Sequence, residues 1–428
     1  MSGVSFLEKL LDGVAVEWKA LDDVIISLKT GLNPRQNFQL NTTDAEGYYV
    51  TVREIQNGKV TFLDKTDRVN KKALGLINNR SNLDAGDLLF SGTGTVGRTA
   101  VVEKKPQNWN IKEGVYAIKP NLSKIHSRYL SHLLNSRETV NDYSKKIVGA
   151  PVISLPMSDL RKLKIPIPCP ENPKKSLEIQ TEIVRILDAF TELTAELTAE
   201  LTAELTARKK QYNYYRDQLL SFEDGAVEWK TLGEVANILR GASPRPIAKY
   251  ITDDVNGVPW IKIGDTSSGS KYVNSTAQKV TPEGAKMSRI LNKGDFIMSN
   301  SMSFGRPYIL NIKGAIHDGW ASISGFSDTL NSDYLYHYLS SNKVQIYWAG
   351  KINSGSVSNL NADIIKSLPV PIPTLSEQEK IAELLDKFDA LTNSITEGLP
   401  REIALRQKQY EYYRDLLLSF PKPAELVF

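Results

Sequence analysis

Apolar residues recur every three or four positions along two stretches of the chain, the spacing of one face of an α-helix. The first stretch, residues 178–222, contains no Gly or Pro and predicts a single long helix. Its apolar stripe is formed by Ile183, Leu187, Phe190, Leu193 and Leu197. The second stretch, near the end of the chain, is interrupted by Gly398 and Pro400, which predicts two shorter helices.

The first long helix contains "TAELTAELTAEL" at residues 194–205, a four-residue unit repeated three times. Leucine occupies positions 193, 197, 201 and 205, which lie on one slowly turning face. Because a helix of this length does not pack alone, we expect the helices near the end of the chain to pair with it as an antiparallel coiled coil.

Between the helical stretches the apolar runs are short, β-branched or aromatic, and separated by Gly, Asn and Asp, which predicts mixed α/β domains. Each of these parts ends on alternating prolines, "IPIPCP" at 165–170 and "VPIPT" at 370–374. Because proline lacks the N–H that a helix needs, these two segments are expected to be extended connectors.

The chain repeats itself. "GVAVEWKALDDV" at 13–24 returns as "GAVEWKTLGEV" at 225–235, and "RKKQYNYYRDQLLSF" from Arg208 returns as "RQKQYEYYRDLLLSF" from Arg406. Between these blocks only sparse landmarks keep their order: "GLNPRQ" with "GASPRP", "YVTVRE" at 49–54 with "WIKIGD" at 260–265, and Tyr129 and His132 with Tyr334 and His337. The sequence therefore predicts a tandem duplication with an α+β fold, in which long helices separate and follow two α/β domains.

"SGTGTVGRT" at 91–99 has the glycine spacing of a dinucleotide site and is one residue from a P-loop, with Arg98 in place of the lysine. Its copy, "SNSMSFGRP" at 299–307, replaces Gly92 and Gly94 with Asn300 and Met302. A phosphate loop also needs a helix next, whereas "TAVV" predicts a strand. The pattern favours an arginine on a polar strand tip, with an ordinary turn as the alternative.

Composition sets the remaining bounds. With 428 residues, 41% hydrophobic and 24% charged, the chain is long enough for two to three domains. Cys169 is the only cysteine, which excludes an internal disulfide and fits the cytoplasm. The sequence shows neither a membrane-spanning run nor a signal peptide's basic flank. A net charge of +4 permits an anionic partner without demanding one.

The two helical blocks, "KKQYNYYRDQLLSF" and "QKQYEYYRDLLLSF", alternate with two variable domains, and the TAEL array lies just ahead of the first block. This arrangement resembles the specificity subunit of type I restriction-modification systems, type IC group, over essentially the whole chain. The resemblance implies a first target-recognition domain with a short N-terminal helical segment at 1–172, a central helical spacer at 173–224, a second target-recognition domain at 225–374 and a C-terminal helical region at 375–428.

The resemblance also implies the partners. Each target-recognition domain would read one half of a bipartite site in double-stranded DNA, and the chain would dock two modification (methyltransferase) and two restriction (endonuclease and translocase) subunits. S-adenosylmethionine, ATP and Mg²⁺ are then expected on those partners and not on this chain. The sequence agrees, because neither Asn33-Pro34 nor Asn172-Pro173 continues as an adenine-methyltransferase motif and there is no Gly-Lys-Ser/Thr. The four histidines are scattered, so His132 and His337 are expected to be packing residues.

Two sets of functional residues follow. Equivalent arginines and the polar residues beside them are expected to face DNA, because arginine can bind a phosphate or a guanine through two parallel hydrogen bonds. These residues are Arg35, Thr93, Thr95, Arg98, Arg245, Ser301, Ser303 and Arg306. The repeated helical blocks are expected to bind the modification subunits, unless their tyrosines pack the coiled coil itself. The residues are Tyr212, Tyr215, Arg216, Tyr410, Tyr413 and Arg414.

The TAEL array is expected to set the distance between the two DNA half-sites. Each unit adds about 6 Å of helix and a net rotation of about 40°, whereas one base pair adds about 3.4 Å and about 34–36°. One unit should therefore correspond to one base pair of spacer, and by resemblance three units imply about seven unspecified base pairs. The alternative is that TAEL is only a good helix-forming seam whose copy number does not matter.

Two other classes of protein stay open on the residues alone. A self-contained DNA methyltransferase would bind S-adenosylmethionine by itself. A coiled-coil adaptor that does not bind DNA would leave the two variable domains unexplained, and its complex would show no salt-dependent DNA binding.

Overall fold

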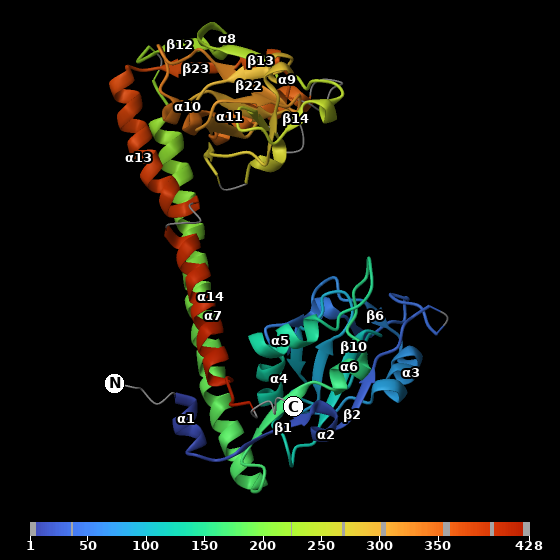
Figure 1. Ribbon diagram of the computed structural model, residues 1–428. Helices are drawn as coiled ribbons and strands as arrows, with labels where there is room; N and C mark the ends of the chain where they lie inside the picture. The colour runs from blue at the N-terminus through green and yellow to red at the C-terminus, as the bar shows by residue number, and fades with distance from the viewer. Residues whose placement is uncertain are drawn as a thin grey trace. The chain divides into compact units, whose positions relative to one another are not determined.

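The structure, a computed structural model, describes residues 6–35, 37–223, 225–267, 270–300, 305–353, 360–393 and 398–422. The chain forms two compact units (Figure 1). Unit 1 comprises Met1–Glu196 and Arg406–Phe428, and unit 2 comprises Leu197–Leu405. Each unit contains one mixed α/β domain and parts of the long helices, which confirms the predicted α+β tandem arrangement.

The domain of unit 1 contains a four-stranded antiparallel sheet in the order β2-β10-β7-β8 and a three-stranded sheet in the order β6-β3-β9. The strands are β1 (Val16–Ala20), β2 (Ile25–Thr30), β3 (Gly47–Val50), β4 (Ile55–Gln56), β5 (Lys59–Val60), β6 (Arg68–Val69), β7 (Leu88–Ser91), β8 (Thr99–Val101), β9 (Trp109–Ile111), β10 (Val115–Pro120) and β11 (Lys164–Pro168). The helices are α1 (Phe6–Leu11), α2 (Leu21–Val24), the 3₁₀ turn η1 (Val52–Glu54), α3 (Lys71–Ser81), α4 (Ser127–Leu134), α5 (Arg137–Ser144) and α6 (Met157–Arg161).

The domain of unit 2 contains two five-stranded sheets, in the orders β13-β22-β19-β20-β16 and β14-β17-β15-β21-β18. The strands are β12 (Glu228–Thr231), β13 (Asn237–Arg240), β14 (Ile251–Thr252), β15 (Val258–Ile261), β16 (Tyr272–Val273), β17 (Gln278–Val280), β18 (Arg289–Leu291), β19 (Phe296–Ser299), β20 (Pro307–Leu310), β21 (Gly314–Ile316), β22 (Trp320–Ser324) and β23 (Pro369–Ile372). The helices are α8 (Leu232–Val235), η2 (Ile247–Lys249), η3 (Ile263–Asp265), α9 (Pro282–Lys286), α10 (Ser332–Leu339), α11 (Asn342–Asn353) and α12 (Ala362–Lys366).

Strands β7 and β19 occupy equivalent central positions and are buried on both faces. In β7, Phe90 packs into the core shared with α4, whereas Leu89 points into a second core on the opposite face. In β19, Met298 and Ile297 divide in the same way. A strand whose alternate side chains enter two cores needs a continuous apolar sequence, which "LLF" and "FIM" provide.

The proline-rich exits are extended, as predicted, but they are paired strands and not free connectors. β11 pairs antiparallel with β1, where Trp18 lies opposite Pro166, and β23 pairs with β12, where Trp229 lies opposite Pro371. A two-stranded sheet leaves each strand an unpaired edge, where a missing N–H costs no ladder hydrogen bond. The repeated "AVEWK" block therefore closes the end of each domain onto its beginning.

The long helix α7 is continuous over Pro173–Leu219. It begins at the first residue of the expected spacer, ahead of the Gly- and Pro-free stretch at 178–222, because the side chain of Asn172 accepts a hydrogen bond from Lys175 N (3.1 Å) and Pro173 fits the first turn. The C-terminal helices are α13 (Leu375–Asn393) and α14 (Gly398–Leu417). Pro400 lies inside the first turn of α14, so α13 ends ahead of the residues predicted to break the helix.

The helices pair within each unit by the same aromatic contact. In unit 1, Phe190 of α7 meets Tyr413 of α14 with ring centroids 5.9 Å apart. One residue further along α7, Thr191 donates to the hydroxyl of Tyr410 (3.0 Å), so the two helices run antiparallel. In unit 2 the tyrosine comes from α7 and the phenylalanine from the C-terminal helix: Tyr215 of α7 stacks on Phe388 of α13, with ring centroids 5.7 Å apart.

Each domain docks on its helices through the same buried amide. In unit 1, Gln180 Oε1 accepts from His126 N (2.8 Å) and its Nε2 donates to Lys124 O (3.1 Å). In unit 2, Gln378 Oε1 accepts from Asn331 N (2.8 Å) and its Nε2 donates to Thr329 O (3.0 Å). Both glutamine side chains are fully buried, so a shift of either domain would leave polar groups unpaired.

A histidine reinforces each docking contact. His132 of α4 lies 2.9 Å from Asp188 of α7, and His337 of α10 lies 2.7 Å from Asp386 of α13. The prediction that both histidines are structural is confirmed, because each joins a domain to its helix.

No helix in the described part of the chain is long and apolar enough to cross a membrane.

Candidate nucleic-acid interface

The tip between β7 and β8 is a closed hairpin loop. Ser91 Oγ donates to Thr95 O (2.6 Å) and accepts from Arg98 N (2.8 Å), while Gly97 N donates to Ser91 O (2.9 Å). Strand β8 follows, as the sequence predicted, so the backbone amides do not lead into a helix N-terminus.

Packing explains two of the tip glycines, Gly92 and Gly97. A Cβ on Gly92 would lie 2.1 Å from the ring of Tyr116, and one on Gly97, which has φ +102°, would lie 2.3 Å from the hydroxyl of Tyr143. In unit 2, Gly305 is pressed against Trp348 in the same way, at 2.6 Å. Gly92 and Gly97 of the nucleotide-like pattern are therefore needed for close contact with aromatic side chains, whereas Gly94, where a Cβ would meet nothing within 4 Å, is favoured by its φ of +78°.

Arg98 and Arg306 follow equivalent tips but have different surroundings. The Arg98 side chain is exposed, and its Nη1 donates to Val52 O (3.1 Å). Arg306 is half-buried, with its guanidinium 5.6 Å from the centre of the Tyr308 ring. Thr95 is exposed and Thr93 is half-buried beside Ser154 (3.2 Å). Ser301 and Ser303 lie outside the described residues.

The second predicted pair of arginines is exposed in both units. Arg35 lies in the turn after β2. The Arg245 side chain is 85% accessible and lies 3.6 Å from Asp318. Neither arginine is fixed by a short hydrogen bond among the described residues, so both are available to an anionic partner.

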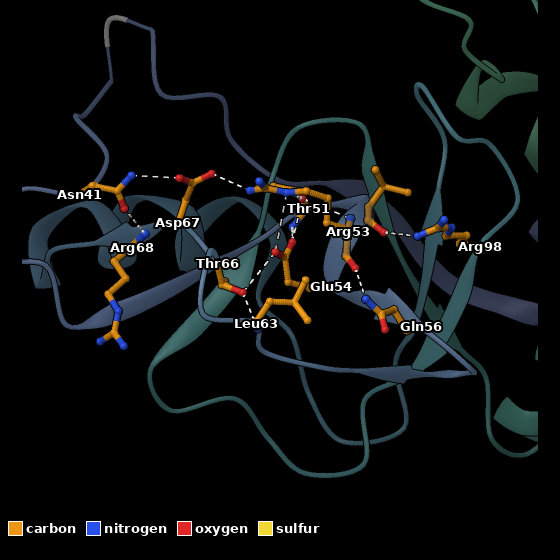
Figure 2. A network of polar contacts seen from close by, with 11 residues as sticks. Asn41, Thr51, Arg53, Glu54, Gln56, Leu63, Thr66, Asp67, Arg68 and Arg98 are labelled. Atoms are coloured by element: carbon orange, nitrogen blue, oxygen red, sulfur yellow. Dashed lines mark hydrogen bonds and ion pairs between the residues drawn. The ribbon is translucent and has the colours of Figure 1, made fainter. Parts of the chain in front are cut away.

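Sequence reasoning missed a polar network at η1, the turn that follows β3 (Figure 2). At its centre is Glu54, a carboxylate with no exposed side-chain surface. Its Oε2 accepts from the amide (2.8 Å) and hydroxyl (2.7 Å) of Thr51, and its Oε1 accepts from the hydroxyl of Thr66 (3.2 Å). A buried carboxylate with three donors is well satisfied and fixes the turn rigidly.

This network holds Arg53. Its Nη2 donates to Asp67 (2.8 Å), and its Nε donates to the hydroxyl of Thr51 (3.3 Å). Asn41 in turn donates to the other oxygen of Asp67 (2.9 Å). Half of the Arg53 side chain stays exposed. Figure 2 shows Asn41, Asp67, Arg53 and Arg98 in one row, which places two arginines at this turn.

The only sequence signal for this turn was the landmark that pairs "YVTVRE" with "WIKIGD". The structure gives it a reason, because Asp265 accepts from Lys262 N (2.7 Å) as Glu54 does from Thr51 N. Arg53, however, corresponds to Gly264 in the second copy. Because only one of the two halves has an arginine at this position, comparison of the halves did not single out Arg53.

Some of the predicted partner-binding residues are buried and others are exposed. Tyr212 and Arg216 are 5% and 4% exposed, and the Tyr212 hydroxyl lies 3.0 Å from His337 Nδ1. Burial raises the pKa of Tyr212 well above its ordinary value. Unit 2 itself covers these two side chains, which leaves little of either exposed to a partner.

Exposed tyrosines are present in both helical blocks. Tyr215 and Tyr413 are 41% and 42% exposed, and their neighbours Tyr214 and Tyr412 are more exposed, at 61% and 64%. Tyr410 and Arg414 are half-buried in unit 1. Each helical block therefore exposes one adjacent tyrosine pair, Tyr214-Tyr215 in unit 2 and Tyr412-Tyr413 in unit 1.

Comparison with known proteins identifies relatives over almost the full chain. The type I restriction enzyme EcoR124I/EcoR124II specificity subunit of Escherichia coli is 37% identical, and the alignment covers 99% of both chains. The EcoprrI specificity subunit of Escherichia coli is 32% identical over 93% of both chains. A solved structure concerning complex assembly and conformational transition of the type I R-M system shares the fold, with a TM-score of 0.68 at 17% identity, covering 94% of this chain and 97% of that one.

A family model, the type I restriction modification DNA specificity domain, matches twice, at residues 14–207 and 226–405. The two matches coincide with the two copies found in the sequence, and together they span most of the chain. The chain therefore belongs to the family of type I restriction-modification specificity subunits.

Proposed function

We propose that this chain is the non-catalytic DNA-reading subunit of a cytoplasmic type I restriction-modification enzyme, and that each unit reads one half of a bipartite site in double-stranded DNA. The observation that carries the proposal is the repeated docking contact. In each unit one glutamine and one aspartate of the helices bind the domain at equivalent positions, and the two domains that they hold are different. These residues are Gln180 and Asp188 in unit 1, and Gln378 and Asp386 in unit 2. Two different domains, each held on an equivalent helical position and each with its own exposed surface, suit two different half-sites.

Arg98 tests whether the strand tips face DNA. We expect Arg98→Ala to weaken binding of the assembled enzyme to its site by about 1–3 kcal/mol, because an exposed arginine contributes to phosphate or base contacts. The measurement is a DNA titration at several salt concentrations. Arg185→Ala on α7 is the control, since Arg185 is exposed but paired with Glu182. If Arg98→Ala binds as tightly as the control, the tip is structural.

We propose that the two helical blocks seat two modification subunits through Tyr215 and Tyr413. Equivalent surfaces on one asymmetric chain can bind two identical partners, and exposed tyrosines are common at the centre of interfaces. We assign catalysis, S-adenosylmethionine, ATP and Mg²⁺ to the modification and restriction subunits. Binding of S-adenosylmethionine by the purified chain alone would instead favour a self-contained methyltransferase.

The double substitution Tyr215→Ala and Tyr413→Ala is expected to cost about 2 kcal/mol or more at each seat. Native mass spectrometry should then detect complexes with fewer than two modification subunits. Each tyrosine also stacks on a phenylalanine of its own unit, so the matched control is Phe190→Ala with Phe388→Ala. Equal loss of partners in both variants would mean that the tyrosines act only inside the helix pair.

A further inference from the structure

We propose that Arg53 reads a guanine in the half-site of unit 1, an inference that rests on the proposed DNA-reading function. Arg53 lies on η1, beside the carbonyl of Val52 to which Arg98 donates. Neither the duplication nor the strand tips pointed to it.

The geometry leaves one edge of the Arg53 guanidinium free. Its inner edge, Nε and Nη2, donates to Thr51 and Asp67. None of the described residues accepts a hydrogen bond from Nη1, and half of the side chain is exposed. The outer edge, formed by Nη1 and the second hydrogen of Nη2, can therefore donate two parallel hydrogen bonds, which match O6 and N7 of guanine in the major groove.

Arg53 is also held in a fixed orientation. Asp67 is itself fixed by Asn41, whose side-chain oxygen accepts from Arg68 N (2.8 Å). On the other side, buried Glu54 lies 3.8 Å from the Arg53 Nε. Because these partners restrict the side chain before binding, little further ordering is needed when it meets a base.

The same carboxylates favour a base over a phosphate. Asp67 neutralises much of the Arg53 charge, and its side chain is 28% accessible beside it. A phosphate approaching this pair would be repelled by Asp67, whereas the acceptors of guanine are uncharged. Arg53 should thus contribute mainly to sequence preference and little to the salt dependence of binding.

The contrast with unit 2 makes the proposal specific to one half-site. The corresponding position is Gly264, and Lys262 at the position of Thr51 donates to Gln278 (2.7 Å). The η3 turn therefore presents no arginine. Replacing Arg53 should change one half of the recognised site and leave the other half as an internal control.

The test is adenine-methylation mapping in cells that carry the complete system, with wild-type chain, Arg53→Lys, Arg53→Ala and Asp67→Asn. Lysine keeps the charge but loses the two-pronged geometry. We expect Arg53→Lys to reduce the preference for guanine at one position of the first half-site roughly 10- to 100-fold, with the second half-site unchanged. Asp67→Asn, which frees the orientation of Arg53, should relax the same position less strongly.

The outcomes separate the alternatives. An unchanged motif in Arg53→Lys would overturn the proposal. So would an unchanged motif in Asp67→Asn together with tighter binding of the assembled enzyme in a DNA titration, since removal of a negative charge would then favour a phosphate contact. If Arg53→Ala fails to assemble, Arg53→Lys decides. A wild-type map without a bipartite motif would instead contradict the proposed function itself.

Discussion

Deletion of residues 198–201 is expected to shorten the preferred spacer between the two half-sites by one base pair and to leave both half-site sequences unchanged. α7 is continuous through this segment, so the deletion removes about 6 Å and about 40° of net rotation from one helix. The rotation nearly equals that of one base pair, and bending of the DNA or of the partners can absorb the remaining displacement. A site with the original spacing should then lose contacts in one half, at roughly 1–3 kcal/mol for each base pair read.

The matched control for the deletion keeps the helix length and changes its composition, through Thr198→Ala with Glu200→Gln. This variant should keep the original spacer, because the length of the helix, and not the residue types of the TAEL units, is expected to set the distance between the two half-sites. Methylation mapping of both variants is the measurement. An unchanged spacer in the deletion variant would show that the array is only a helix-forming seam.

Asp386→Ala is expected to loosen the domain of unit 2 on its helix. Asp386 accepts hydrogen bonds from His337 (2.7 Å) and Lys271, and the Lys271 side chain is only 9% exposed. Removing the carboxylate leaves a nearly buried ammonium with fewer partners, which should cost about 2–3 kcal/mol, near the lower end for a broken buried ion pair because Asp386 is itself partly exposed.

The control for Asp386 is the equivalent residue of unit 1. Asp188 pairs with His132 and with Arg128, whose side chain is 40% exposed, so Asp188→Ala should cost only about 1 kcal/mol. Hydrogen exchange in the assembled enzyme is the measurement, comparing α10 and α13 in the first variant with α4 and α7 in the second. Equal or greater loss of protection in Asp188→Ala would contradict this reasoning.

The Asp386 contact should also depend on pH. Burial raises the pKa of Asp386, but the hydrogen bonds from His337 and Lys271 outweigh burial and hold this pKa below its ordinary value. A carboxyl whose pKa is lowered by folding contributes stability above its unfolded pKa, about 3.9, and loses that contribution as the pH falls through the folded value. The contact is therefore fully formed at neutral pH.

The helices and the duplication were predictable because their signals are local or repeated. The leucine spacing of α7 predicts a helix from the local sequence alone. The repeated "AVEWK" and "YYRD" blocks can be found by comparing the sequence with itself, without knowledge of the fold. The ends were less predictable. The start of α7 depends on the Asn172 cap, and at the start of α14 a Cβ on Gly398 would lie 2.5 Å from Leu391 O of α13.

The roles of the functional side chains were harder to predict from the sequence, because the residues that surround them come from distant parts of the chain. Tyr212 and Tyr215 look alike in the sequence, yet Tyr212 is covered because His337 docks against its hydroxyl. In the sequence Gly92 resembles a phosphate-loop glycine, but in the structure it makes room for the ring of Tyr116. Arg53 is held by Asp67 and looked like an ordinary polar residue, since its counterpart is Gly264.

Mapping methylated adenines in a genome from cells carrying the whole system shows directly whether the two units of this chain read two halves of one DNA site. We expect one bipartite motif, with two fixed half-sites separated by an unspecified spacer of constant length. A single continuous motif, or half-sites at variable separation, would contradict it.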